Sequence, residues 1–393
     1  MAVQLFRPVF RVNECIEGIR EVLESGWAGQ GPKCKKFEEE FSSFVGRPRG
    51  LYTNSATASL HLAVHLLDLP PGSKIATTPI TFCSTNHAIK YAGHVPIFCD
   101  VNRDLSMGSE SVLNAIRAGA RAVIWVHHGG QVSADFYKLM AALDVFEAQG
   151  LHIPVIEDCA HAAGGYYREQ VYCGGGADFQ VVKSRIGSNQ RNFAAFSFQA
   201  VKNMPTADSG FLFCPTPELT ARAEKLVWLG IDKTTFSRTN TSSDEVYKWR
   251  YTIEEIGWKY NANDVMAAIA LVQLKYLDED NAYRANVYEW YRKHLAAAGL
   301  YLVEHQTGSS HHLVNVLIKN REEAIVAMKK AGYAPGVHYL PNQEFPVYAD
   351  CAKYAQPLTV TNAIAEHILT LPNHLEITED HVQAVVQALK SVS

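Results

Sequence analysis

Residues 194–210, AAFSFQAVKNMPTADSG, hold the first candidate for chemistry, because an apolar run there ends on a single lysine, Lys202. The turn-forming sequence Asn-Met-Pro follows this lysine, and Ser197 precedes it with a hydroxyl. A lysine desolvated in an apolar pocket has a lowered pKa and becomes a nucleophile that can form a Schiff base with an aldehyde. A solvated surface charge is the ordinary alternative, and this stretch alone does not decide between the two.

A second candidate is the small polar run at residues 54–57, which directly precedes the helical pattern ASLHLAVHLL. The free backbone N–H groups at such a helix start, with the hydroxyls of Ser55 and Thr57, would form a cradle suited to phosphate. A plain helix N-cap is the alternative interpretation.

The third candidate is Asp158 in VIEDCAHAAGG, at the carboxyl end of a predicted buried strand and three residues before His161. A carboxylate is costly to bury without a partner, and a protonated pyridine nitrogen would serve as that partner. Capping of the following helix is an equally open role for Asp158.

Together these three features predict a site for pyridoxal 5′-phosphate, which needs a lysine, a carboxylate for its ring nitrogen and a phosphate cup. The cofactor ring also needs an apolar face. Phe82, in TPITFCSTNHA after a predicted strand, stands where that face is expected, although it could equally be a core residue.

The elements that must position these residues are short apolar strands alternating with helices. Helical patterns end at Gly26 and Gly46, and later helices are predicted near 57–67, 83–92, 109–117 and 135–149. The strands are predicted in SKIATTP, HVPIFCDV, ARAVIWVHH and HIPVIEDC. This alternation predicts an α/β fold whose mostly parallel sheet is covered by helices on both faces, with ligands at the carboxyl ends of the strands.

The second half of the chain has a different pattern. Residues 264–298 are predicted to form one long helix that bridges a large domain (1–284) and a small α/β domain (285–393). The small domain should contain a strand in HLVNVLI, a helix at 321–331 and a final helix that starts at the N-cap Thr378.

The composition narrows the class of protein. A hydrophobic fraction of 47%, a charged fraction of 19% and a net charge of −4 are ordinary for a globular enzyme and give no footprint for nucleic acid. Neither a membrane span nor a signal peptide is predicted. The eight cysteines form no CxxC pairs or Cys/His clusters, which argues against disulfides and a metal site and fits a reducing cytoplasm.

Eight ordered segments resemble the DegT/StrS family of sugar aminotransferases, which are fold-type-I pyridoxal-phosphate enzymes. The resemblance covers nearly the whole chain. Its segments are SGWAGQGPKCKKFEEEFSSFVG, NSATASLHLAVHLL, TPITFCSTNHAIKYAGHVPIFCDVNRD, VHHGGQVSAD, VIEDCAHAAGG, FSFQAVKN, IGWKYNANDVMAAIALVQL and GVHYLPNQEFPVY.

The resemblance implies a role for each matched residue. Lys202 would hold the cofactor and later move a proton between substrate and cofactor. Asp158 would keep the ring nitrogen protonated, and His161 stands where the family usually has Gln facing the phenolic oxygen. Phe82 would stack on the ring, while Ala56, Thr57 and Ser197 would hold the phosphate.

The resemblance also implies a homodimer with its active site at the subunit interface. Asn261 matches a residue that reaches the phosphate from the partner subunit. His338 and Tyr339 of GVHY match a loop that borders the sugar substrate.

Two further departures from the family pattern accompany His161. The glycine-rich run after the lysine is replaced here by PTADSG, which makes that loop less flexible. The stretch at 179–193 is longer and more basic than usual. It is a surface insertion or else brings Lys183, Arg185 or Arg191 near a nucleotide diphosphate.

The resulting prediction is an aminotransferase that converts a keto group of a nucleotide-linked sugar to an amine, with glutamate as donor. The alternatives are the same chemistry on a free cyclitol or other keto sugar, a sugar dehydratase, and a non-catalytic cofactor-binding regulator. Lys202 weighs against the dehydratase, because that branch carries His at its position. No DNA-binding segment supports the regulator.

Overall fold

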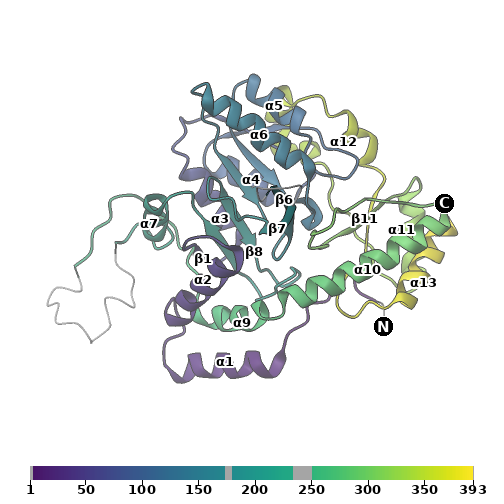
Figure 1. Cartoon of the computed structure of the whole chain (residues 1–393), viewed down its shortest axis with the longest axis horizontal. Helices are drawn as coiled ribbons and strands as arrows, with labels where there is room; N and C mark the ends of the chain where they lie inside the picture. The colour runs from purple at the N-terminus through teal and green to yellow at the C-terminus, as the bar shows by residue number, and fades with distance from the viewer. Residues whose placement is uncertain (1–2, 173–178, 233–249, 393) are drawn as a thin grey trace.

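The computed structural model describes residues 3–172, 179–232 and 250–392 of the chain (Figure 1). At its centre is a seven-stranded sheet, in which β9 is antiparallel to both its neighbours while the pairs from β8 to β3 are parallel. In spatial order the strands are β1 (Leu51–Thr53), β9 (Gly210–Phe213), β8 (Phe193–Ser197), β5 (Val155–Asp158), β4 (Ala120–Val126), β2 (Lys74–Thr77) and β3 (Val95–Phe98). The predicted α/β class, the strands and the mostly parallel sheet are confirmed.

Helices cover both faces of this sheet. One face packs against α2 (Pro32–Val45), α5 (Ser109–Arg117), α6 (Ala134–Ala148) and α9 (Asp264–Leu274), and the other against α3 (Ala56–His65), α4 (Cys83–Tyr91) and α7 (Pro217–Leu226). The predicted ends of the first helices hold. α2 stops at Gly46, whose φ of 81° is left-handed, and α1 (Val12–Glu24) stops two residues before Gly26.

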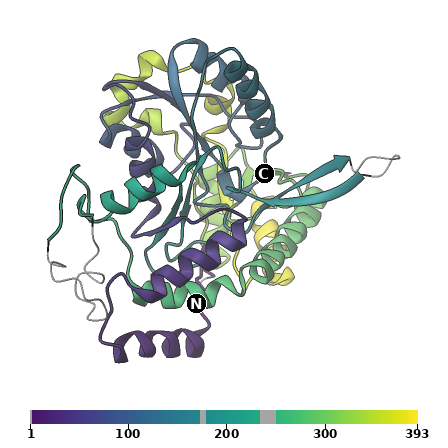
Figure 2. The ribbon, with the colours of Figure 1, turned by 60° about the vertical axis from the view of Figure 1, so that its left-hand side comes forward.

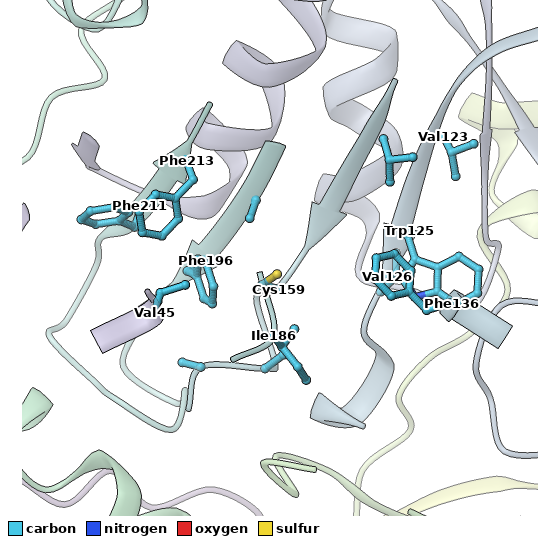
Figure 3. Close-up of a cluster of buried hydrophobic side chains, with 14 of the residues drawn as sticks. Val45, Val123, Trp125, Val126, Phe136, Cys159, Ile186, Phe196, Phe211 and Phe213 are labelled. Carbon is cyan, nitrogen blue, oxygen red and sulfur yellow. The ribbon is translucent and has the colours of Figure 1, made fainter. Parts of the chain in front are cut away.

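The side chains of the strands alternate between the two hydrophobic cores, as a pleated strand requires. On β4, Val123 and Trp125 face the α2/α6 side, whereas Ala122 and Ile124 face the α3/α4 side. Figure 3 shows the first core, in which Trp125 packs beside Phe136 of α6 and Phe196 lies beside Phe213. Burial on both faces fixes the register of the strands, and with it the residues at their ends.

The single long helix predicted over 264–298 is wrong. The chain forms two helices, α9 and α10 (Leu277–Ala298), separated at Lys275 and Tyr276. Those two amides bond to carbonyls three residues back, so the helix tightens and then restarts. Close to the break, the buried Gln273 side chain donates to Val9 O of the N-terminal segment at 2.9 Å. No Gly or Pro marks this break in the sequence.

The C-terminal part has its own core. An antiparallel sheet of β10 (Tyr301–Leu302), β11 (Val314–Leu317) and β12 (Ile368–Leu371) packs with α10, α11 (Arg321–Lys330) and α13 (Glu379–Lys390). Thr378 caps α13, as predicted, in a capping box with His381. The domain boundary at 284/285 stays a prediction, and α10 crosses it as one helix. In the described ranges there are also α12 (Thr359–Ile364) and the 3₁₀ segments η1 (His128–Gly130), η2 (Asn342–Glu344) and η3 (Pro346–Tyr354).

A two-stranded hairpin projects from the body of the molecule (Figure 2). It is formed by β6 (Tyr166–Tyr172) and β7 (Phe179–Arg185), so the predicted insertion at 179–193 begins as its second strand. Across the described ranges, no helix is long and apolar enough to cross a membrane.

Candidate active site

A cavity of about 400 Å³ opens at the carboxyl ends of β5 and β8, where the fold predicts a ligand. Nine of the predicted site residues line it. They are Ala56, Thr57, Phe82, Asp158, His161, Ser197, Lys202, His338 and Tyr339.

Lys202 lies in the turn that follows β8, with its backbone N–H bonded to Gln199 O at 2.8 Å. Burial lowers the pKa of Lys202 to about 8, against the opposing attraction of Asp158. No hydrogen bond or ion pair from the described residues engages its amine. A substantial fraction of this amine is therefore neutral near pH 8, which is the state that attacks an aldehyde.

Asp158 is the last residue of β5 and is buried. Its Oδ2 accepts from Thr85 Oγ1 at 2.7 Å, and its Oδ1 accepts from the Ala160 N–H at 3.1 Å. Burial raises the pKa of Asp158, and these two donors oppose that rise. Within the described ranges no cation forms an ion pair with it, so a cationic group in the cavity would supply its missing partner. The alternative role of Asp158 was to cap a following helix. Its one backbone contact of that kind is the bond from the Ala160 N–H, two residues on.

The N-terminus of α3 forms another wall of the cavity. Ser55 is its N-cap and its Oγ accepts from the Ala58 N–H, while the amides of Ala56 and Thr57 lie at the open end of the helix. A Cβ at Gly210 would meet the Ser55 carbonyl carbon at 2.3 Å, so only glycine lets β9 approach this helix start. The N-cap and phosphate interpretations are therefore compatible, because the cap leaves two amides for an anion.

His161 lines the cavity with both ring nitrogens engaged by the protein. Its Nδ1 accepts from the Gly129 N–H at 3.3 Å, and its Nε2 lies 3.0 Å from the Tyr339 hydroxyl. The ring stacks between His312 and Tyr339. Burial holds the pKa of His161 well below its ordinary value, so the imidazole is neutral.

Phe82 and His338 also line the cavity. Phe82 is 55% exposed, which rules out the alternative of a core phenylalanine. His338 bonds to Thr370 Oγ1 at 3.0 Å, and burial lowers its pKa to about 4.

The sequence analysis missed Thr85 and Asp208. Thr85 lies on α4, one helical turn after Phe82, and its spacing from that residue was the available signal. Asp208 belongs to the PTADSG loop and adds a second carboxylate to the lining of the cavity.

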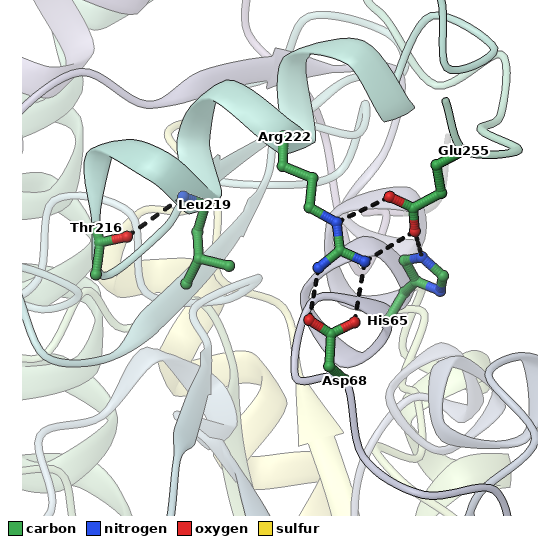
Figure 4. Close-up of polar contacts among 6 residues, drawn as sticks. All are labelled: His65, Asp68, Thr216, Leu219, Arg222 and Glu255. Atoms are coloured by element: carbon green, nitrogen blue, oxygen red, sulfur yellow. Dashed lines mark hydrogen bonds and ion pairs between the residues drawn. The ribbon is translucent and has the colours of Figure 1, made fainter. Parts of the chain in front are cut away.

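Asn261 lies outside this cavity. It lines a second one of about 570 Å³ with Trp27, Trp228 and Lys259, whose amine is 2.9 Å from Asn261 Oδ1. Glu255, six residues before Asn261, is held by the ion pairs of Figure 4, in which Arg222 of α7 contacts both Asp68 and Glu255.

The three basic residues predicted near a nucleotide also lie elsewhere. Arg191 pairs with Asp144 and Glu147 of α6 at the surface. Lys183 and Arg185 line a third cavity, of about 610 Å³, where Arg185 pairs with Asp278 at 2.6 Å. The structure therefore does not bring these three side chains to the Lys202 cavity.

Three buried side chains near the carboxyl ends of β4 and β5 are of the types that bind metal ions, namely His127, Glu157 and Cys159. Glu157 accepts from Asn192 Nδ2 at 2.9 Å and contacts His127 Nε2 at 3.0 Å, so both of its oxygens have protein partners. We interpret the group as a hydrogen-bonded support for the strand end that carries Asp158.

The lining residues fit pyridoxal 5′-phosphate. The unpaired amine of Lys202, the buried Asp158 without an ion-pair partner and the open amides of α3 match its aldehyde, ring nitrogen and phosphate. Phe82 offers an exposed ring to the same space.

Comparisons with known proteins agree with this geometry. The model of the DegT/DnrJ/EryC1/StrS aminotransferase family matches residues 11–390. The spore coat polysaccharide biosynthesis protein SpsC of Bacillus subtilis is 30% identical, over 97% of this chain and 94% of its own. The sugar aminotransferase CalS13 of Micromonospora echinospora is 26% identical, with a TM-score of 0.84 over 99% of each chain.

A third relative bears on the cofactor. Spr1654 of Streptococcus pneumoniae, a sugar aminotransferase by name, is 25% identical with a TM-score of 0.85 over 98% of each chain, and its solved structures include PLP and PMP forms. The family match, this neighbour and the lining residues lead to one conclusion. The chain belongs to the DegT/DnrJ/EryC1/StrS aminotransferase family and is a pyridoxal-phosphate-dependent aminotransferase.

Proposed function

We propose that this enzyme converts a keto group of a nucleotide-linked sugar to an amine, with glutamate as the amino donor, in amino-sugar biosynthesis. The observation that carries the proposal is the convergence of Lys202, Asp158 and the α3 N-terminus on one cavity. The names of CalS13, Spr1654 and SpsC support a sugar substrate.

Each residue of the cavity has a task in this proposal. The cofactor, when bound, supplies an electron sink for the carbon that loses a proton. Lys202 Nζ takes that proton and returns it, which its lowered pKa favours near neutral pH. Asp158 holds the ring nitrogen in its protonated form, and Phe82 packs on the ring. His338 and Tyr339 border the sugar.

The phosphate end is assigned to Ala56, Thr57 and Ser197. Ser197 ends β8 and is buried, with its Oγ 3.4 Å from the Gln199 N–H. The amides of α3 add the positive end of a helix dipole, which favours an anion there.

The charge of the cavity supports a homodimer. Among the lining residues that the structure describes, Lys202 is the one Lys or Arg, and Asp158 and Asp208 are the two carboxylates. A phosphate and a glutamate bring several further negative charges, so cations must come from outside this cavity. A second subunit that inserts Asn261, beside Lys259, would meet this need.

A complementation experiment tests the shared site. Lys202→Ala and Asn261→Asp should each abolish turnover, because one removes the amine and the other adds a carboxylate beside the phosphate. Co-expression of the two variants should restore part of the activity, since a mixed dimer contains one intact site. If the mixed dimer forms and stays inactive, Asn261 acts in its own subunit; if Asn261→Asp alone keeps full activity, Asn261 has no role in the site.

The nucleotide contacts are assigned to the basic residues of the third cavity. Lys183 and Arg185, which line the third cavity, are our candidates for the diphosphate, and Arg185 would exchange its ion pair with Asp278 for it. Arg191 lines none of the three cavities described above and is paired with two carboxylates. Lys183→Ala and Arg185→Ala should raise KM for the nucleotide-linked sugar and leave KM for glutamate unchanged.

The absorbance of the holoenzyme tests the reaction. Glutamate should bleach the cofactor band, and one member of a panel of nucleotide-linked keto sugars should restore it. A band that only a free cyclitol restores would contradict the nucleotide linkage, and a band that glutamate leaves intact would contradict the donor.

A further inference from the structure

The Tyr339 hydroxyl is hydrogen-bonded to His161, and the donor and acceptor of this bond can be assigned. Its oxygen lies 3.0 Å from Nε2 of His161, and the two rings are nearly parallel, with an interplanar angle of 13°. His161 is itself held on its other side by the His312 ring, at 4.6 Å between centroids.

The tautomer of His161 follows from its second nitrogen. Nδ1 faces the backbone N–H of Gly129 at 3.3 Å, and a backbone N–H can only donate. Nδ1 therefore carries no proton, and in a neutral imidazole the proton must be on Nε2. His161 consequently donates to the Tyr339 oxygen.

With the hydrogen bond in this direction, the phenolic proton of Tyr339 has no acceptor among the described residues. The oxygen accepts from His161, and across the described residues no other hydrogen bond engages it. Tyr339 lines the Lys202 cavity, so a ligand in that space can accept this proton. The one N–H of the neutral His161 ring donates to Tyr339, so His161 has no donor left for a ligand.

We propose that Tyr339, oriented by His161, is a hydrogen-bond donor to an oxygen of the ligand bound in the Lys202 cavity. The inference rests on the proposed site and deepens it. Two sources present such an oxygen, namely the phenolic oxygen of the cofactor and an oxygen of the keto sugar. Tyr339 would then perform the role that the family resemblance implies for position 161, and His161 would be its positioning residue.

The surroundings keep this donor in its protonated form. Burial raises the pKa of Tyr339, and the nearby Asp158 adds to that rise. The other titratable groups that face the pair are Lys202, His128, His312, His338 and Cys83. Burial first, and then repulsion from the Lys202 amine and the neighbouring histidines, lowers the pKa of His161 and keeps it neutral.

The test uses the cofactor alone with three variants of the full-length protein. Tyr339→Phe removes only the hydroxyl. His161→Asn can still accept from Gly129 through its amide oxygen but is too short to donate to Tyr339. His161→Gln places an amide N–H near the position of Nε2 and is the conservative variant expected to rescue the donation. Circular dichroism of each variant checks that it folds.

The first readout is the pH titration of the cofactor absorbance in the holoenzyme, without any substrate. A donor to the phenolic oxygen stabilises its deprotonated form, so its loss should raise the titration midpoint of the cofactor band. We expect Tyr339→Phe and His161→Asn to raise the midpoint by about one pH unit, and His161→Gln to stay near wild type.

The second readout separates the two oxygen sources. If the midpoint is unchanged but Tyr339→Phe and His161→Asn both lower kcat/KM for the keto sugar about tenfold, with glutamate kinetics unchanged, the acceptor is a sugar oxygen. Either result supports the donor role. If Tyr339→Phe changes neither readout, or if it and His161→Asn differ, the inference is overturned. Because the titration needs no sugar, it stands even if the proposed sugar reaction fails.

Discussion

The Thr85 hydroxyl donates to the carboxylate of Asp158 over 2.7 Å and is itself 2.9 Å from the Thr81 hydroxyl. This contact joins the first turn of α4 to the last residue of β5. It gives a buried carboxylate a donor that favours its ionised form, which is the form that pairs with a protonated pyridine nitrogen.

Thr85→Val should therefore weaken cofactor binding. Loss of a hydrogen bond to a charged group costs about 1.5–3 kcal/mol, so we expect the dissociation constant for pyridoxal 5′-phosphate to rise at least about tenfold. Thr85→Ser keeps the hydroxyl and is the matched control. Equal dissociation constants for the two variants would show that the hydroxyl does not act on the cofactor.

Lys202 should destabilise the cofactor-free protein at neutral pH. Burial lowers its folded pKa to about 8, below the ordinary lysine value of 10.5, so the unfolded chain binds more protons between these values and stability rises with pH across that window. Lys202→Met should accordingly unfold at a higher urea concentration than wild type at pH 7, with a difference that shrinks from pH 8 to pH 10. A difference that is constant with pH would contradict the lowered pKa.

The PTADSG loop contains Ala207 at a φ of 90°, which strains any residue with a Cβ. Ala207→Gly should stabilise the protein by about 1 kcal/mol, the reverse of the usual cost of such a change. Ala331→Gly, at an exposed site with a φ of −79°, is the control and should destabilise. Urea denaturation of both variants measures the two signs.

The ion pairs of Arg222 should give a pH-dependent contribution to stability. The Arg222 guanidinium is the main cause that lowers the pKa of Glu255 to about 2, so this stability is present above about pH 4.5 and is lost as the pH falls toward 2. Both side chains are about one-third exposed (32% and 34%), which limits the effect to about 1 kcal/mol. Arg222→Met should lower the unfolding free energy at pH 7, and the deficit should narrow below pH 4.5. A deficit that is the same at pH 7 and pH 3.5 would exclude Glu255 as its source.

Sequence periodicity predicted most of the fold. The strands that end in Thr77, Phe98, Val126 and Asp158 could be found because each is a short apolar run, and their parallel order follows from the helices between them. The break at Lys275 and Tyr276 could not be found: no Gly or Pro marks it, and the nearby bond of Gln273 to the distant Val9 carbonyl joins two separate segments. A tertiary contact of this kind leaves no local pattern.

The site shows the same division. Lys202 and Asp158 could be identified because each is a charged residue at the end of an apolar run. The hydrogen bond of His161 to Tyr339 could not, because it joins residues 178 positions apart and depends on the direction of the Gly129 N–H. The ion pairs of Arg185 and Arg191 with carboxylates on α10 and α6 could likewise not be read from the sequence.

The central claim is that Lys202 holds the cofactor. Reduction of the holoenzyme with borohydride makes the bond between lysine and cofactor permanent, and peptide mass spectrometry then locates it. The account predicts one pyridoxyl label, on the peptide that contains Lys202, and no label in Lys202→Met. A label on any other lysine, or an unlabelled Lys202 peptide from fully loaded enzyme, would contradict it.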